Sequence, residues 1–229
     1  MTECHLVSPC HCPGKRLDEE PAPRLDTVSG DHYFSDNPAT PATAKDFDFS
    51  LPDRTLSVRG LSGTFSHSGL DKGTAVLLEH TPPPPPGVLV DLGCGWGPIA
   101  MTLAHYQPEA TVFAVDVNPR ALEATRENAE RAGFPLITPI SPDEFPEGTA
   151  IDCLWSNPPI RIGKEALHQL LTTWLNRLSP DGSAWLVVSK NLGADSLQTW
   201  INGGGAGAFQ CERMASKKSF RVLQVRKKS

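Results

Sequence analysis

The sequence predicts an α/β domain in which a mostly parallel, doubly wound sheet is covered by helices on both faces. Two observations lead to this prediction. Short apolar runs alternate with segments of helix length through the middle of the chain, which is the pattern of parallel strands joined by crossover helices. In addition, 39% of the 229 residues are hydrophobic and 21% are charged, which is enough apolar material for one core and little more.

The first thirty residues are expected to form a disordered extension, with the folded domain at residues 31–229. This stretch is rich in proline, charge and cysteine and has no apolar periodicity. Its cysteines and histidines lack the paired spacing of a structural zinc site, so we expect no bound metal. They are Cys4, His5, Cys10, His11 and Cys12.

The domain is expected to begin with a short hairpin followed by a helix. Alternating apolar residues occur in 47–51 and 55–58, and Pro52 and Asp53 between them are turn residues. Apolar residues at helical spacing follow in 73–80. This helix must end before the five prolines at 82–86, because proline lacks the N–H that continues a helix.

From Val88 onward the alternation of strands and helices becomes regular. Buried parallel strands are short runs of Val, Ile and Leu, and glycine or proline marks the ends of the helices between them. Strands are expected at residues 88–90, 111–115, 151–155 and 184–189, with an alternating edge strand at 219–226; helices are expected at 99–106, 120–132 and 164–178.

A glycine-rich turn joins the first of these strands to its helix. Its sequence, Asp91-Leu92-Gly93-Cys94-Gly95-Trp96-Gly97, allows the backbone to turn tightly and approach a ligand that the helix N-terminal amides face. The strict nicotinamide fingerprint fails, because its last glycine position holds Pro98. A glycine turn by itself can also be a tight connection that binds nothing.

Two acids stand at the carboxyl ends of neighbouring predicted strands. Asp91 ends the first strand and Asp116 ends the second, where ligands bind in open parallel sheets. We expect Asp116 to accept hydrogen bonds from both hydroxyls of a ribose. The alternative is that Asp116 caps the helix that begins near Pro119, a role for which Asn118 is an equally good candidate.

The two segments D-L-G-C-G-W-G and A-V-D-V-N together resemble the first two motifs of class I S-adenosylmethionine-dependent methyltransferases. The resemblance implies a Rossmann-like fold with a seven-stranded sheet and S-adenosylmethionine as the cofactor. It further implies that Asp116 binds the ribose and that Asp143 contacts the adenine amine. The residues that would hold the methionine part are Asp91, Gly93, Gly95 and Gly97.

The segment Ser156-Asn157-Pro158-Pro159 follows the strand predicted at 151–155 and suits the methylation of a planar nitrogen. An exocyclic amine is a poor nucleophile, because its lone pair is conjugated into the ring. The Asn157 side-chain oxygen and the Pro158 carbonyl could each accept one amine hydrogen, while Pro158 and Pro159 fix the backbone. Asparagine does not titrate, so we expect catalysis by positioning. The alternative is a proline-rich loop that merely ends a strand.

S-N-P-P resembles the fourth motif of methyltransferases that modify adenine, guanine or the glutamine of release factors. Three further segments narrow the match: His32-Tyr33-Phe34-Ser35, Gly63-Thr64-Phe65-Ser66 and Leu70-Asp71-Lys72-Gly73-Thr74. With them, the stretch from about Asp31 to Arg226 is similar to the catalytic domain of the ribosomal RNA guanine exocyclic-amine (N2) methyltransferases of the small subunit. The resemblance implies ribosomal RNA or the small ribosomal subunit as the partner.

One residue departs from that family pattern. An aromatic usually follows the two prolines, whereas this chain has Ile160. Base stacking on an aromatic is worth about 1 to 3 kcal/mol, so either another ring stacks the base or the acceptor differs. The candidate rings are Trp155, Phe34 and Trp96. The other acceptors considered are a protein glutamine and a small molecule, and a third possibility is a cofactor-binding or RNA-binding assembly factor without turnover.

Charge and hydropathy set the remaining expectations. The net charge of −5 does not indicate a nucleic-acid binder, yet residues 213–229 hold seven basic residues and no acidic one. These basic residues, with Arg161 and Lys164, would either contact phosphates or remain solvated.

No apolar run is long enough to span a membrane and no secretory signal begins the chain, which favours a cytoplasmic protein.

Overall fold

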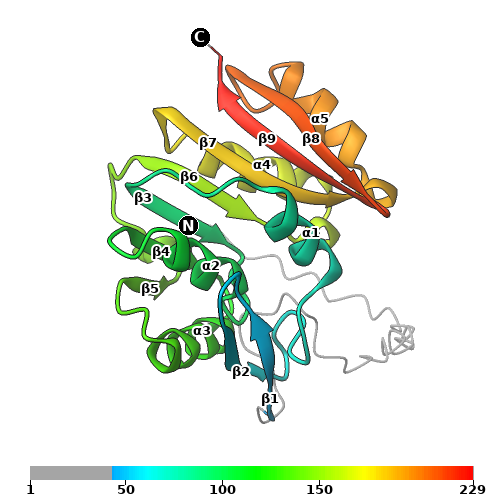
Figure 1. The fold of residues 1–229 in the computed structure, drawn as a ribbon. Coiled ribbons are helices and arrows are strands. Elements are labelled where there is room, and N and C mark those ends of the chain that lie inside the picture. Colours follow the sequence, from blue (N-terminus) through cyan, green and yellow to red (C-terminus); the bar gives the residue numbers. More distant parts are fainter. Residues whose placement is uncertain (1–42, 229) are drawn as a thin grey trace, which may run out of the picture. The chain divides into compact units, whose positions relative to one another are not determined.

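A computed structural model describes residues 43–228, so the predicted extension at 1–30 and Phe34 lie outside the described residues. The central sheet has the strand order β5-β4-β3-β6-β7-β9-β8 (Figure 1). The first five strands in this order are parallel, and β9 runs antiparallel to both β7 and β8. The strands are β3 (Val88–Leu92), β4 (Thr111–Val115), β5 (Ile137–Ile140), β6 (Ile151–Ser156), β7 (Leu178–Ser189), β8 (Phe209–Lys217) and β9 (Phe220–Lys227). The predicted α/β fold with a mostly parallel seven-stranded sheet is confirmed.

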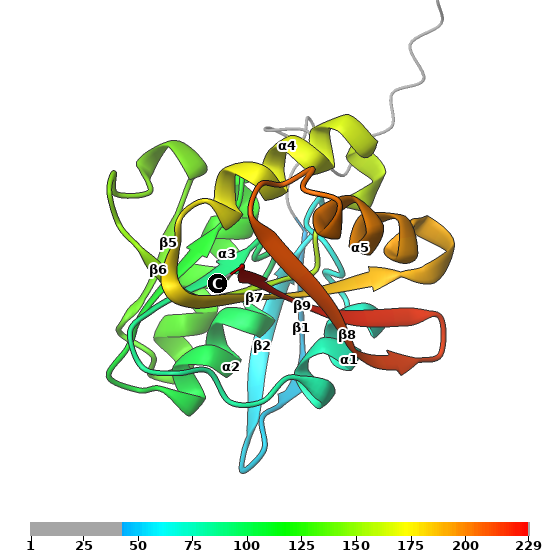
Figure 2. The same ribbon diagram turned by 90° about the horizontal axis from the view of Figure 1, so that it is seen from above.

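Helices cover both faces of this sheet. They are α1 (Lys72–His80), α2 (Pro98–Tyr106), α3 (Pro119–Ala132), α4 (Lys164–Leu175) and α5 (Ala194–Asn202). Side chains of α1, α2 and α3 share one buried cluster, whereas those of α4 and α5 belong to a second. Figure 2 shows α4 and α5 on the opposite side of the sheet from α1 and α2. The two clusters arise because successive residues of a strand point to opposite faces: Leu89 joins the first and Val90 the second.

Most predicted elements are present, but several differ in extent or position. The strand predicted at 184–189 begins earlier, at Leu178, and the edge strand predicted at 219–226 is the inner strand β9, which pairs with β7 and β8. The helix predicted at 164–178 ends at Leu175, because Leu178 already pairs with Ile151 as the first residue of β7. Helix α5 and the strands β5 and β8 are not among the elements predicted from the sequence. Only Phe209 and Cys211 are buried in β8, as expected of an edge strand, and α5 begins after Gly193 without a side-chain cap to signal its start.

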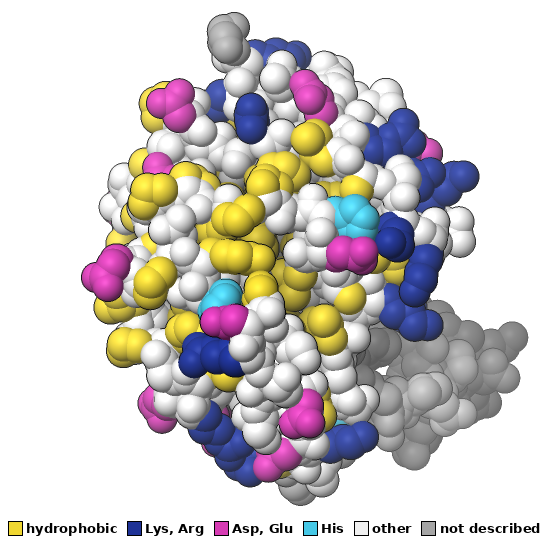
Figure 3. Space-filling view, viewed as in Figure 1, with side chains coloured by type: hydrophobic (Ala, Val, Ile, Leu, Met, Phe, Trp, Pro, Cys, Tyr) yellow, Lys and Arg dark blue, Asp and Glu magenta, His cyan; other side chains and the backbone are white. Residues whose placement is uncertain are grey.

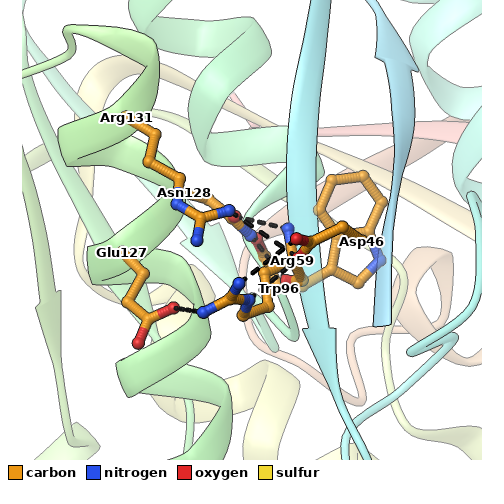
Figure 4. Close-up of polar contacts among 6 residues, drawn as sticks. All are labelled: Asp46, Arg59, Trp96, Glu127, Asn128 and Arg131. Carbon is orange, nitrogen blue, oxygen red and sulfur yellow. Dashed lines mark hydrogen bonds and ion pairs between the residues drawn. The ribbon is translucent and has the colours of Figure 1, made fainter. Parts of the chain in front are cut away.

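The predicted hairpin is present as a separate two-stranded sheet, β1 (Ala44–Ser50) and β2 (Thr55–Leu61), and it supports the glycine-rich turn. The rings of Phe47 and Phe49 pack edge-on against Trp96 at centroid distances of 5.1 and 5.2 Å. Asn128 of α3 is buried and accepts a hydrogen bond from Arg59 N at 2.7 Å (Figure 4). Its Nδ2 donates to the carbonyls of Arg59 and Trp96, each at 2.9 Å. The hairpin, α3 and the turn are thereby joined through one side chain.

Asn128→Ala is expected to lower the free energy of unfolding by about 2 to 3 kcal/mol, because it leaves three backbone groups without their partner. Urea denaturation measures this change. Glu127→Gln is the matched control on the same helix: it weakens only a 3.5 Å ion pair with Arg59 at the surface, for which less than about 1 kcal/mol is expected. Equal losses in the two variants would contradict the prediction.

Candidate functional site

A cavity of about 510 Å³ lies at the carboxyl edge of the parallel strands. Each of the first five strands in the sheet order contributes residues from its end or from the loop that follows, and β9 contributes its first residue. These residues are Pro142 after β5, Val115 to Val117 at β4, Leu92 and Gly93 at β3, Asn157 to Pro159 after β6, Ser189 at β7 and Phe220 at β9. The sheet topology thus brings together segments that are far apart in the sequence.

The glycine turn forms one wall of this cavity through Gly93. Gly93, Gly95 and Gly97 have φ values of 79°, 59° and 89°, a region that residues with a side chain rarely adopt. A Cβ on Gly93 would meet no atom within 4 Å, so the backbone is open on that side, whereas one on Gly97 would lie 3.0 Å from Thr125 Cγ2. Of the three predicted glycines, only Gly93 lines the cavity; Gly97 allows close packing against α3.

Asp91 lies beneath the turn and not on the cavity wall. Its side chain is completely buried, and Oδ2 accepts a hydrogen bond from Ala100 N of α2 at 2.9 Å. Oδ1 has no hydrogen-bond partner in the part of the chain that the structure describes. Burial without a cationic partner raises the pKa of Asp91 to about 8. The carboxyl group is therefore largely protonated at neutral pH.

Asp116 lies on the cavity wall at the end of β4. Its Oδ2 accepts from Gly95 N at 3.0 Å and its Oδ1 from Asn118 N at 2.9 Å, while burial raises its pKa. Asn118, not Asp116, caps α3, because Asn118 Oδ1 accepts from Arg120 N at 3.0 Å. Each carboxylate oxygen has two acceptor positions, so Asp116 can still accept two hydrogen bonds from a ligand.

Asp143 does not line the cavity. It is exposed on the short 3-10 helix Pro142–Glu144, and the neighbouring Pro142 faces the cavity instead. A capping box holds this turn, with Glu144 Oε2 accepting from the backbone N and the hydroxyl of Ser141 at 2.8 and 2.9 Å.

The side-chain amide of Asn157 is held from one side. Its Nδ2 donates to Asp71 Oδ2 at 2.9 Å and to Thr74 Oγ1 at 3.0 Å. Among the described residues none donates to Asn157 Oδ1, and Asn157 lines the cavity. The amide therefore offers an acceptor and not a donor to a molecule in the cavity.

The two prolines after Asn157 form a tight turn. Ile160 N donates to Pro158 O at 2.8 Å, and Pro159 has φ −74° and ψ 76°, the geometry of an inverse γ-turn. The Pro158 carbonyl thus already accepts one hydrogen bond and has one acceptor position left. Ser156 Oγ fixes the start of this segment by donating to Leu92 O at 2.7 Å.

Two of the three rings proposed to replace the missing aromatic are not available to a ligand, and the third, Phe34, lies outside the described residues. Trp155 and Trp96 are buried in the core, where neither can stack on a ligand. The cavity has Phe65 and Phe220 as aromatic lining, with Ile160 between the prolines and Arg161. Phe220 was not identified from the sequence, because it begins β9, an inner strand paired with β7 and β8, and no local pattern links that strand to residues 157–159.

Within residues 43–228 no helix is long and apolar enough to cross a membrane. The same residues contain no group of three or more His, Cys, Asp or Glu side chains placed to bind a metal ion. The cysteines and histidines of the first twelve residues lie outside the described part of the chain.

Comparison with known proteins gives consistent matches. The model of the methyltransferase small domain family matches residues 55–224. The uncharacterized protein YbxB of Bacillus subtilis is 32% identical over 170 residues, covering 72% of this chain and 85% of that protein. Ribosomal RNA small subunit methyltransferase C of Pseudomonas entomophila is 31% identical over 217 residues, which is 92% of this chain but 63% of that protein.

Among solved structures, the T. thermophilus 16S rRNA N2 G1207 methyltransferase, in complex with AdoMet and guanosine, superposes with a TM-score of 0.70. It is 20% identical, and the match covers 82% of this chain and 52% of that one. This likeness concerns the fold. The chain therefore spans about six tenths of the Pseudomonas relative and about half of the T. thermophilus protein.

Proposed function

Since this chain belongs to the methyltransferase small domain family, we propose that it transfers a methyl group from S-adenosylmethionine to a guanine exocyclic amine in ribosomal RNA. The observation that carries the proposal is the Asn157 amide, which lines the cavity beside the glycine turn and has its nitrogen bonded to Asp71 and Thr74, so that its oxygen is left to accept from a ligand. The name of the Pseudomonas relative, a ribosomal RNA methyltransferase, supports this acceptor.

The cavity fits the cofactor in size and chemistry. Its volume lies within the range of about 300 to 1,000 Å³ that is usual for small-molecule sites. Asp116 offers acceptor positions for ribose hydroxyls, and Val117, Ala121 and Pro142 provide apolar wall for a purine ring. The unpartnered Oδ1 of Asp91 lies beneath the turn that would hold the methionine part, where Asp91 would fix the turn from below. Asp143 is exposed on its 3-10 helix, so the contact with the adenine amine that the resemblance implies stays a prediction.

The protein's own contribution to the reaction is positioning. S-adenosylmethionine, when bound, supplies a methyl group on a positively charged sulfur. Asn157 Oδ1 and the remaining acceptor position of Pro158 O would each accept one hydrogen of the acceptor amine, which directs its nitrogen into the cavity. Holding two reactants in line contributes several kcal/mol to catalysis without a titrating base. The proton that the methylated amine must lose would leave to solvent after the transfer.

Phe220 is the ring that we assign to stacking on the acceptor base. Phe65 lies against Gly95 on the cofactor side, with its Cβ 3.8 Å from where a Gly95 Cβ would be. Phe220 instead starts β9 beside Ser189 and the prolines that follow β6. It can therefore perform the role that an aromatic at the position of Ile160 performs in the family pattern.

Phe220→Ala is expected to raise KM for the RNA by about 5-fold to 100-fold, since base stacking on an aromatic is worth about 1 to 3 kcal/mol. Phe220→Tyr, which keeps the ring, should stay near the wild type. Steady-state methyl transfer measures KM for both variants. Thermal unfolding of each variant shows whether loss of the partly buried ring has destabilised the fold. An unchanged KM in Phe220→Ala would rule out stacking at this position.

Basic side chains near the acceptor end of the cavity support a nucleic acid as the partner. Arg161 lies on the cavity wall. Lys217 ends β8, where it also forms an ion pair with Glu79 at 3.2 Å, and Lys218 lies in the turn that leads to Phe220. Figure 3 shows Lys and Arg side chains along the edge of the molecule where this hairpin lies in Figure 1. Such a local cluster can contact phosphates even though the whole chain has a net charge of −5.

Methyl transfer to ribosomal RNA from cells that lack this protein tests the proposal. Isolated small subunits and their protein-free RNA are incubated with the enzyme and methyl-labelled cofactor, digested, and separated by mass spectrometry. We expect label in N2-methylguanosine. Label in a protein glutamine or a small molecule, or cofactor binding without transfer to any fraction, would refute the proposed acceptor. The small ribosomal subunit as partner and a cytoplasmic location remain predictions that depend on this result.

A further inference from the structure

We propose that Asp71 and Thr74 are positioning residues that hold the Asn157 amide in a single orientation, with its oxygen toward the acceptor amine. The effect on catalysis that we infer rests on the proposed function, whereas the orientation of the amide does not. Asp71 Oδ2 accepts three hydrogen bonds, from Gly73 N at 2.7 Å, Thr74 N at 3.0 Å and Asn157 Nδ2 at 2.9 Å. Thr74 Oγ1 accepts the second hydrogen of that Nδ2 at 3.0 Å.

Orientation matters because the two ends of an asparagine amide have similar shape and opposite hydrogen-bonding character. The terminal torsion of Asn is broad and roughly two-fold, so a free side chain samples both orientations. In the flipped orientation, NH2 would face the amine of the acceptor, and two donors cannot bond. Asp71 Oδ2 already accepts from Gly73 N and Thr74 N, so turning the amide would bring two acceptors together, Asn157 Oδ1 against Asp71 Oδ2, and is disfavoured.

The carboxylate is itself held in place by α1. Asp71 is the N-cap of this helix, and its bonds to the N–H groups of Gly73 and Thr74 fix its rotamer. Residue 73 needs to lack a side chain, because a Cβ there would lie 2.9 Å from Asp71 Oδ2 and 3.0 Å from the Phe220 ring. The start of α1 thus connects the proposed amine acceptor with the proposed stacking ring.

Capping and positioning can be separated by the choice of variant. Asp71→Ser keeps a good helix cap but is too short to reach Asn157, and Thr74→Val removes the hydroxyl from a buried side chain of nearly the same shape. Asp71→Asn keeps an oxygen at the same reach, and Thr74→Ser keeps the hydroxyl. The double variant Asp71→Ser/Thr74→Val should therefore free the amide, while Asp71→Asn and Thr74→Ser are the matched controls.

The geometry is tested without cofactor or RNA. In the ¹⁵N spectrum of the full-length protein, the side-chain NH2 of Asn157 is identified by its loss in Asn157→Ala. We expect its protons to exchange with water at least 10-fold more slowly in the wild type and in both controls than in the double variant. Equal exchange in the wild type and the double variant would overturn the proposal.

The consequence is tested by kinetics. The double variant should lose about 10-fold to 100-fold in kcat, as misplacement of about 1 Å commonly does. Its KM for RNA and its cofactor Kd should remain within about threefold of the wild type, and its unfolding midpoint within a few degrees. The control variants should keep the kcat of the wild type. The proposed positioning role would be overturned by an unchanged kcat in the double variant. It would also be overturned if Asp71→Asn lost as much kcat as the double variant. If the Asn157 NH2 protons exchange slowly in the wild type but the protein methylates no RNA, the proposed orientation of the amide would stand and the proposed function would be refuted.

Discussion

Asn157→Ala is expected to reduce kcat for methyl transfer by about 1,000-fold or more, equivalent to about 4 kcal/mol of transition-state stabilisation. The variant removes the only side-chain acceptor that the S-N-P-P segment directs into the cavity. The remaining acceptor, Pro158 O, is already bonded to Ile160 N and cannot orient the amine by itself. Transfer of labelled methyl groups to ribosomal RNA under saturating conditions measures the loss.

Cofactor binding separates a catalytic defect from a damaged site. Because Asn157 lies at the end of β6, and Gly93 and Asp116 lie at the ends of β3 and β4, the Kd measured by calorimetry should change by less than about threefold, or about 0.6 kcal/mol. Asn176→Ala, at the C-terminal end of α4, is the matched control and should keep full activity. A kcat near the wild-type value in Asn157→Ala would exclude the role that we propose for this residue.

Asp91→Asn is expected to remove a pH-dependent destabilisation of about 4 kcal/mol at pH 7, offset in part by the cost of burying the asparagine NH2 where Oδ1 has no partner. In the unfolded chain Asp91 titrates near its usual pKa of about 3.9, whereas in the folded protein burial raises its pKa to about 8. Between these values the folded state holds a proton that the unfolded state has released, so the wild type loses stability as the pH rises from about 4 to about 8. Asparagine does not titrate, and its oxygen can still accept from Ala100 N.

The pH dependence is the decisive measurement for this variant. Urea denaturation at pH 4.5 and at pH 8 should give a small difference between Asp91→Asn and the wild type at the lower pH and a large one at the higher pH. Asp116, whose pKa burial also raises, is present in both proteins, and its repulsion is one cause of the raised pKa of Asp91, so this repulsion is relieved in Asp91→Asn. Parallel pH profiles would show that Asp91 is ionised in the folded protein. The cofactor Kd of the same variant tests whether Asp91 contributes to binding through the glycine turn.

The elements with a strong local signal could be predicted from the sequence. The strand predicted at 111–115 has those bounds in the structure, and the helix predicted at 120–132 begins one residue earlier, at Pro119. Both are defined by apolar periodicity with proline or glycine at the ends, which acts over a few residues. The helix predicted at 164–178 was too long because the apolar Leu178 fits a helical and a strand pattern equally well, and only pairing with Ile151 decides between them.

The sequence by itself determined which chemical groups this protein has and the order in which they follow its strands: a glycine turn, the acid Asp116, and Asn157 with its prolines. The tertiary structure alone decided which of them share a cavity, that Asn118 rather than Asp116 caps α3, and that Asp143 stays outside. It also placed Asp71 2.9 Å from an amide 86 residues away. The physical reason is that periodicity and capping are local, whereas the contacts of a site at a sheet edge depend on strand order and side-chain packing, which no single segment encodes.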